Sequence, residues 1–260
     1  DAVEMKQEHF TKWMWNAVAT YELEIGKHRG DVMAGMELNR EDDINFAAYR
    51  EGFAILTPDY MYPSAGVGQS QASGGAGGFS LVSYFGKLNY SYADKYLLSF
   101  TLRRDGSSRF GSNNKYATFP SVSLGWNLTN ESFMEKRPDW LTNTKIRLSW
   151  GKNGNEAIGN FRYTANVSMN NNYPFGAYGR GQQIVMGSKP SGTPNAGLMW
   201  EESEQYDAGI DFGFLGNALT FTVDYYQKKT NGMLKEMAIP NYLGESKPWG
   251  NVGSMKNEGV

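Results

Sequence analysis

Apolar and polar side chains alternate along eight segments of the chain, and this period of two is typical of β-strands whose two faces meet different surroundings. In the first segment the apolar positions are every second residue from Trp13 to Ile25. The other seven segments begin their apolar series at Val32, Val82, Tyr96, Val122, Ile146, Tyr206 and Leu219. The pattern predicts an all-β chain of antiparallel strands.

Charged residues in these segments fall on one face only. The apolar series contain no charge, whereas the interleaved positions carry many Ser and Thr residues and also Glu37. We expect the remaining charged positions of that face to line a lumen: Glu22, Glu24, Lys87, Arg103, Lys145, Arg147, Asp207, Asp211 and Asp224. A lumen with so many charges is wide and hydrated, unlike the filled interior of a small eight-stranded barrel. We therefore predict part of a larger transmembrane barrel.

The links between the segments alternate between short and long. Residues 26–30, 93–95 and 215–217 form short links, whereas 40–79 and 152–199 form long ones. Outer-membrane barrels have short periplasmic turns and longer extracellular loops, so the alternation favours such a barrel. Loops this long are uncommon in a compact soluble domain.

Two further links have intermediate length. Residues 105–115 form a medium link, and 129–143 form a moderate one in which 133–141 is expected to be a short helix under the barrel. The glycine-rich stretch 66–78 is predicted to be a mobile outer loop, and 152–155 is predicted to be an Asn-Gly turn.

Aromatic residues gather at both ends of the predicted strands, where they fit the two membrane–water interfaces of a barrel. A general preference of strands for aromatic residues is the alternative explanation. The residues beside long links are Trp13, Trp15, Trp150 and Tyr116, and those beside short links are Tyr90, Tyr92, Tyr96, Trp126 and Phe214.

The amino-acid composition excludes a helical membrane protein and gives no indication of nucleic-acid binding. Aromatic residues make up 14% of the chain, the net charge is −2, and cysteine is absent. No apolar run approaches the roughly 20 residues of a membrane-spanning helix, which excludes a helical membrane protein. The balanced charge gives no basic patch for nucleic acid, so we expect no nucleic-acid partner.

Four stretches of the chain match a known family at ordered spacing. The first is YFGKLNYSYADKYLLSFTLRRDGSSRFGSNNKYATFPSVSLGWN, residues 84–127, in which the element DGSSRFG, residues 105–111, is specific. The others are WLTNTKIRLSWGKNGNEAIGNF (140–161), LMWEESEQYDAGIDFGFLGNALTFTVDYYQKK (198–229) and the closing GNVGSMKNEGV (250–260). Together they cover about two thirds of the chain in the expected order, and in them the chain resembles the SusC/RagA-type TonB-dependent outer-membrane transporters.

The resemblance implies a multi-pass protein of the bacterial outer membrane, with a barrel of 22 strands, an N-terminal plug, and a segment that contacts TonB. It also implies a SusD-like surface lipoprotein that covers the barrel mouth, contact with outer-membrane lipid, and import of a glycan or peptide. The plug, the TonB-contacting segment and the final strands are expected to lie outside these 260 residues, which form a fragment of the barrel domain.

Two groups of residues are candidates for a site at the barrel mouth. Asp105 and Gly106 are predicted to form a tight turn that Arg109 fixes by pairing with Asp105. Aromatic residues of the long links can stack on sugars or peptides, contact a lid protein, or pack on one another. They are Tyr60, Tyr62, Tyr173, Phe175, Tyr178 and Trp200.

The sequence offers no sign of catalysis, of a metal site or of a cofactor. His9 and His28 stand apart, whereas a zinc site needs three or four converging ligands. A glycosidase based on Glu201, Glu202 and Glu204 has no independent support, which leaves an outer-membrane hydrolase as the weakest alternative. A soluble carbohydrate-binding β-sandwich and a passive porin are the stronger alternatives.

Overall fold

The computed structural model describes residues 1–169, 171–176, 181, 183–243 and 246–260. The chain divides into two compact units, one of residues 1–15 with 38–81 and one of residues 16–37 with 82–260. Among the described residues, no helix is long and apolar enough to cross a membrane.

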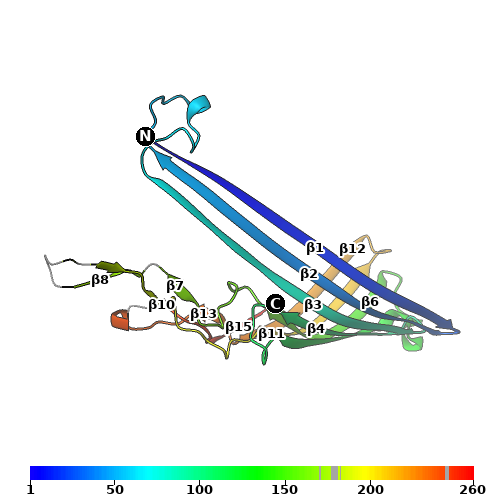
Figure 1. Cartoon of the computed structure of the whole chain (residues 1–260). Helices are drawn as coiled ribbons and strands as arrows, with labels where there is room; N and C mark the ends of the chain where they lie inside the picture. The colour runs from blue at the N-terminus through cyan, green and yellow to red at the C-terminus, as the bar shows by residue number, and fades with distance from the viewer. Residues whose placement is uncertain (170, 177–180, 182, 244–245) are drawn as a thin grey trace. The chain divides into compact units, whose positions relative to one another are not determined.

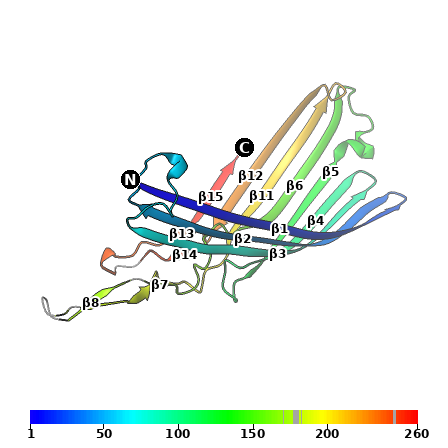
Figure 2. The same ribbon diagram turned by 45° about the horizontal axis from the view of Figure 1, so that its top comes forward.

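Nine strands form one sheet whose strand order is the order of the chain (Figures 1 and 2). This up-and-down order is the one found in barrels built from consecutive hairpins. The strands are β1 (Ala2–Ile25), β2 (His28–Glu51), β3 (Ser70–Tyr92), β4 (Tyr96–Ser107), β5 (Tyr116–Asn127), β6 (Leu141–Asn155), β11 (Glu201–Phe214), β12 (Leu219–Asn231) and β15 (Ser254–Gly259).

Short elements occupy the links between these strands. Three small antiparallel pairs join β7 (Val167–Met169) to β10 (Ser188–Pro190), β8 (Tyr173–Phe175) to β9 (Gln183–Val185), and β13 (Leu234–Glu236) to β14 (Trp249–Asn251). Single 3-10 turns are η1 (Pro58–Tyr60), η2 (Leu128–Asn130), η3 (Ser132–Met134) and η4 (Asn241–Leu243).

The register of the paired strands agrees with the predicted phase of alternation. Leu98 of β4 lies opposite Leu124, and Leu124 lies opposite Leu148 of β6. The same row continues through Ala208 to Tyr225. Because directly opposed residues point to the same side of a sheet, one face of these five strands is apolar, as predicted.

The apolar face is exposed. Leu124 is 51% exposed and Phe221 is 57% exposed, and neither Leu98 nor Ile210 is buried. Among the described residues of the second unit, the buried apolar side chains are instead Phe110, Phe119, Ile158, Leu198 and Trp200. Phe119 is the only one of these five within a strand, so this unit is a single-layer sheet with a small core next to its long links.

Three predictions about strand ends are wrong. The link predicted at 40–79 covers only 52–69, and the glycine-rich residues 70–78 belong to β3. Small residues are needed there because a Cβ on Gly74 would lie 2.9 Å from the Asn45 carbonyl oxygen of β2. Trp13 and Trp15 consequently lie within β1 and not at its end.

Two smaller features also differ from the sequence prediction. Residues 152–155 are the last residues of β6 and not a turn, because Gly154 pairs with Glu202 of β11. The expected helix at 133–141 is only the 3-10 turn η3. The short turns at 93–95 and around 215–217 are confirmed, and the closing segment supplies the ninth strand, β15.

Candidate functional site

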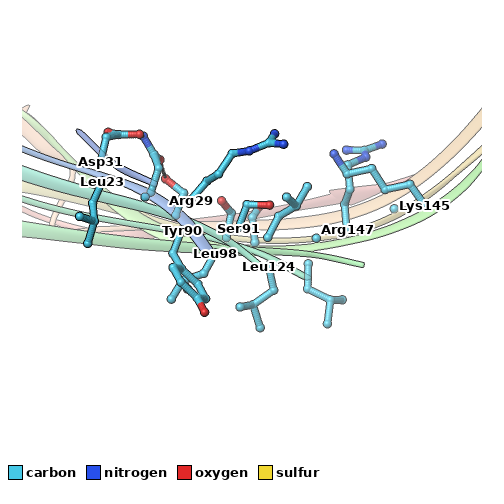
Figure 3. Close-up of a pocket in the computed structure, with 18 of the residues that line it drawn as sticks. Leu23, Arg29, Asp31, Tyr90, Ser91, Leu98, Leu124, Lys145 and Arg147 are labelled. Carbon is cyan, nitrogen blue, oxygen red and sulfur yellow. Dashed lines mark hydrogen bonds between the residues drawn. The ribbon is translucent and has the colours of Figure 1, made fainter. Parts of the chain in front are cut away.

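The polar face of the second unit gathers charged side chains from neighbouring strands. Figure 3 shows Arg29, Asp31, Ser91, Lys145 and Arg147 on one side of the sheet. On the other side it shows the apolar set Leu23, Tyr90, Leu98 and Leu124. The strands of this region enclose a hollow of about 660 Å³, and Glu22, Glu24 and Asp207 also line it.

Arg147 of β6 joins three strands through two carboxylates. Its guanidinium donates to both oxygens of Asp211 on β11, at 2.7 and 2.9 Å, and to Asp224 of β12 at 2.8 Å. Thr222 adds a hydrogen bond to Asp211 at 3.0 Å. A two-pronged contact of this kind fixes the planar guanidinium and so holds the strands in register.

Glycines make room for this arginine. Arg147 lies opposite Gly125 of β5 and Gly209 of β11, and Gly209 in turn lies opposite Asp224. A Cβ at Gly209 would lie 2.9 Å from the Arg147 guanidinium and would overlap the Asp224 carboxylate. The absence of a side chain at Gly209 therefore lets a residue of β6 reach one of β12 across the strand between them.

A second polar network connects β2, β3 and β4. The Asn89 amide donates to Asp31 at 3.0 and 3.1 Å, and Ser99 donates to Asn89 at 2.8 Å. Arg29 pairs with Glu24 and with Asp94, both at 3.1 Å. Neither Arg29 nor Asp31 was predicted to face the lumen, because Arg29 lies in the predicted link at 26–30 and Asp31 directly follows it.

The other predicted lumen-facing residues lie in the same series of strands. Asp207 accepts hydrogen bonds from Ser149 at 3.1 Å and Gln205 at 2.9 Å. Lys145 lies directly opposite Asp211. Lys87 of β3 is two residues from Asn89 and so shares its side of the strand.

The predicted turn at Asp105 and Gly106 is wrong, and so is the pairing of Arg109 with Asp105. Both turn residues belong to β4, where Gly106 lies opposite Tyr116. A Cβ on Gly106 would overlap the Tyr116 ring, which explains the glycine without a turn. Asp105 accepts from Arg103 at 2.8 and 2.9 Å.

Arg109 forms hydrogen bonds with residues other than the predicted Asp105. It donates to the Asn160 side chain at 3.2 Å and to the Glu156 carbonyl at 3.3 Å. Both acceptors belong to the long link that follows β6. Arg109 therefore ties the link after β4 to the link after β6.

The loop aromatics fall into two groups. Trp200 is only 7% exposed, packs 5.3 Å from Phe110 and 5.6 Å from Phe119, and donates to the Lys115 carbonyl. For Trp200 the structure therefore supports packing within the folded links, which was one of the open alternatives, and contradicts contact with a ligand or lid. Tyr173 and Phe175 of β8 are 64% and 62% exposed, and their rings lie 5.4 Å apart edge to face.

Tyr60 and Tyr62 belong to the first unit, where both side chains are exposed in the link between β2 and β3. Tyr178 lies outside the described residues. The structure therefore leaves four of the six aromatic candidates accessible to a ligand: Tyr60, Tyr62, Tyr173 and Phe175.

On the apolar face, a row of aromatic rings follows the short turns. His28, Tyr92, Tyr96 and Trp126 succeed one another with ring centroids 4.8, 6.4 and 6.5 Å apart. Glu131, between η2 and η3, accepts from Tyr96 Oη at 2.7 Å, Lys95 Nζ at 3.0 Å and Trp126 Nε1 at 3.1 Å. These hydrogen bonds, that of Tyr96 first, lower the pKa of Glu131 to about 2.

A second aromatic pair lies inside β6 and β11, about five residues from the ends that join the long link. Trp150 and Tyr206 face each other across β6 and β11, and both donate to Glu204, at 2.8 and 3.1 Å. From Tyr206 to Phe214, the apolar series of β11 spans about 27 Å along the strand. At a strand tilt of 35–45° this corresponds to a band about 20 Å high, close to the apolar band of outer-membrane barrels.

The chain matches a known protein family over nearly all of its length. The family described as "TonB dependent receptor-like, beta-barrel" matches residues 5–260. The TonB-dependent receptor P3 of Formosa agariphila is 35% identical over 92% of this chain and 23% of its own length. The TonB-dependent receptor SusC of Bacteroides thetaiotaomicron is 40% identical over 70% of this chain and 18% of its own length.

Solved structures agree with the sequence relatives. The RagAB peptide transporter superposes on 98% of this chain and 27% of its own chain, with a TM-score of 0.87 and 30% identity. The RagAB peptide importer in its "open-open" state gives a TM-score of 0.85 over 99% of this chain. The chain thus spans between 18% and 27% of the length of these relatives.

Two of the alternatives to an outer-membrane transporter, the soluble β-sandwich and the hydrolase, are excluded. The match to a barrel family and the exposed apolar face exclude the soluble β-sandwich, whose apolar faces would pack against each other. The relatives are receptors and transporters, so the hydrolase alternative is excluded too, and the chain is not an enzyme. The protein belongs to the TonB-dependent receptor-like β-barrel family.

Proposed function

We propose that this chain is part of the transmembrane barrel of an importer in the bacterial outer membrane. In this proposal TonB supplies the energy, and the cargo is an oligomeric nutrient, a glycan or a peptide. The observation that carries the proposal is the division of one sheet into an exposed apolar face and a charged face. An apolar face suits lipid and a charged face suits a hydrated lumen.

The polar face would act as a rigid wall of the transport path. Arg147, Asp211 and Asp224 satisfy one another and hold three strands together. Side chains already fixed by their own partners do not have to be reorganised when a hydrated cargo passes. We assign the plug and the TonB-contacting segment to parts of a longer protein, as the SusC/RagA resemblance implies.

The outer links would meet the cargo and the surface lipoprotein. Tyr173 and Phe175 offer an exposed edge-to-face pair of rings, a shape on which sugar faces or peptide side chains can stack. The SusD-like lipoprotein is proposed as the lid over the same links. The similar RagAB structures are described as peptide transporters, which supports a peptide as one of the two cargo classes.

Uptake by cells tests the proposal. A strain lacking the receptor that contains this chain is compared with the restored strain, using labelled oligosaccharides in one arm and labelled peptides in the other. We expect only the restored strain to accumulate one of the two labels. Equal accumulation by both strains in both arms would contradict the proposal.

Energy dependence separates an importer from the passive porin. Collapse of the proton gradient should stop uptake through a TonB-dependent receptor, because TonB transmits energy from the inner membrane. A porin would let the same label pass at an unchanged rate. Uptake that survives an uncoupler would therefore replace the importer with the porin.

A further inference from the structure

The N-terminal part of β3 is an open edge within the sheet. β3 has 23 residues and β4 has 12, and the short turn 93–95 joins them, so β4 pairs only with the part of β3 nearest the turn. The hydrogen bond from Ser99 to Asn89 fits this register. In the described part of the chain, β2 is therefore the only strand beside residues 70–78. One row of their backbone N–H and C=O groups has no strand partner.

Closure of the barrel does not cover this edge. Further strands of a longer receptor would pair with β1 and β15, which are the two ends of the nine-stranded order. β3 already has its two neighbours, β2 and β4, and β4 is too short to reach residues 70–78. Closure alone therefore leaves this row of backbone groups open to a strand from another molecule.

The edge lacks the features that protect natural edge strands from pairing. Lysine, proline and bulges usually prevent such pairing. Residues 70–78, SQASGGAGG, contain no charged residue and no proline, and four of the nine are glycine. Residues 70–76 are exposed. Because glycine within a strand often marks a place where another backbone approaches closely, this composition favours addition of a strand.

The open edge lies beyond the apolar band of the barrel. Gly78 precedes Tyr92 by 14 residues, which corresponds to about 46 Å along the strand. At a strand tilt of 35–45° this gives a height of about 35 Å, more than the apolar band of about 25 Å. Since the short turns of such barrels are periplasmic, residues 70–78 lie on the outer side, where cargo arrives.

The neighbouring strand β2 places a carboxylate beside the glycines. A Cβ on Gly77 would lie 2.5 Å from Asp43 Oδ1, so this carboxylate lies against the backbone of β3. The acids on either side of Asp43 each have one basic partner, Lys12 for Glu41 and Arg40 for Asp42. Among the described residues, no ion pair includes Asp43. The first unit as a whole has eight acidic and four basic residues, so its field also favours a cation.

We propose that residues 70–78 bind an extended peptide, which adds to the open edge of β3 as a further strand. The inference rests on the proposed function and deepens it, because it selects the peptide from the two cargo classes. Strand addition uses the backbone of the ligand, so it accepts many sequences, and Asp43 favours those with lysine or arginine. A glycan has no regular row of N–H and C=O groups and cannot pair in this way.

Residues with even numbers present their backbone groups to the open edge. The Glu51 N–H donates to the Gln69 carbonyl at 3.0 Å, which places the backbone groups of residue 69 toward β2. Because these groups alternate between the two edges of a strand, those of residues 70–78 with even numbers point away from β2. A proline at such a position removes a donor from the open edge and leaves the bonds to β2 intact.

Ala76→Pro and Ala76→Val test the site as a matched pair. Their side chains are similar in size, and only proline lacks the N–H. Because nine residues span about 30 Å, the probe is a labelled peptide of about eight residues that alternates alanine with lysine. Its dissociation constant for the complete receptor in detergent is measured by fluorescence anisotropy. We expect saturable binding to the unmodified receptor, about tenfold weaker binding to Ala76→Pro, and a change within about twofold for Ala76→Val.

A second measurement leaves the receptor unmodified. N-methylation of successive residues in the probe removes N–H donors from both of its edges without changing its sequence or charge. We expect about hundredfold weaker binding of the methylated probe. Equal affinity of the two probes would overturn the proposal, and so would equal affinity of Ala76→Pro and Ala76→Val. Absence of saturable binding to the unmodified receptor would overturn it too, because another part of the receptor would then cover the edge.

Uptake by cells distinguishes this inference from the proposed function. Import of labelled peptides at the same rate by Ala76→Pro and Ala76→Val would overturn the site and leave the importer in place. Import of oligosaccharides alone would have the same meaning. A receptor that imports neither label contradicts the proposed function, whatever its affinity for the probe in detergent.

Discussion

At the scale of single residues, side-chain direction decides which surroundings a position meets. Phe100 and Thr101 are neighbours in β4, yet Phe100 pairs with Val122 and Thr101 with Ser121. Phe100 is 42% exposed on the apolar face. One step along the chain therefore changes the expected surroundings from hydrocarbon to a hydrated lumen.

A charge placed at these two positions should change stability by very different amounts. Phe100→Arg should lower the free energy of unfolding in a bilayer by roughly 2–4 kcal/mol, because an arginine near the membrane midplane loses its hydration. Thr101→Arg should have a much smaller effect, because its guanidinium reaches the polar face. Urea titrations of the receptor in lipid vesicles measure both values. Equal losses for the two variants would mean that the assignment of faces is wrong.

At the scale of strands, the alternation could be predicted from the sequence but the strand lengths could not. Period-two hydrophobicity is visible only where the two faces of a strand meet different surroundings. N-terminal to Trp13, β1 carries polar residues on both sides, among them Glu4, Lys6 and Gln7, although it begins at Ala2. The strand continues there without a signal that single-sequence reasoning can detect.

The candidate site was predictable to a similar degree. The sequence indicates which residues share the polar face, because parity alone decides it. It does not indicate that the missing side chain at Gly209 allows Arg147 to reach Asp224, because that contact depends on which residues lie opposite each other in neighbouring strands. Nor does it separate Trp200, which is buried, from Tyr173, which is exposed, because both lie in the same long link.

The link between β5 and β6 should make stability depend on pH. Glu131 has an ordinary pKa of 4.5 and a folded-state pKa of about 2, lowered by the hydrogen bonds from Tyr96, Lys95 and Trp126. Because the folded-state pKa is the lower one, the stabilisation is complete above pH 4.5 and is lost as the pH falls toward 2. Acid should therefore loosen this link.

Glu131→Gln isolates that contribution. The variant should be less stable than the unmodified receptor at pH 7, and the difference between the two should shrink between pH 4.5 and pH 2. Unfolding free energies measured at both ends of this range give the comparison. A difference that stays constant with pH would show that Glu131 does not titrate in this window.

At the scale of the whole sheet, the two edge strands limit what the 260-residue chain can do by itself. β1 and β15 each have one neighbour in the nine-stranded sheet, so each leaves one row of backbone N–H and C=O groups unpaired. In hydrocarbon every unpaired group costs several kcal/mol, which is why only closed barrels span membranes with strands. The exposed apolar face favours contact with lipid. The unpaired edges, however, make insertion of this sheet alone into a bilayer unfavourable.

Residues 1–260 expressed alone should therefore not insert as a monomer. After refolding with lipid vesicles they should remain sensitive to added protease, whereas the longer receptor should give a protected barrel, because closure pairs both edges. Crosslinking of the same samples should show the isolated chain associating through its edges. Protease-resistant insertion of a single copy would contradict the role of these edges, because a sheet with two open sides would then be stable in hydrocarbon.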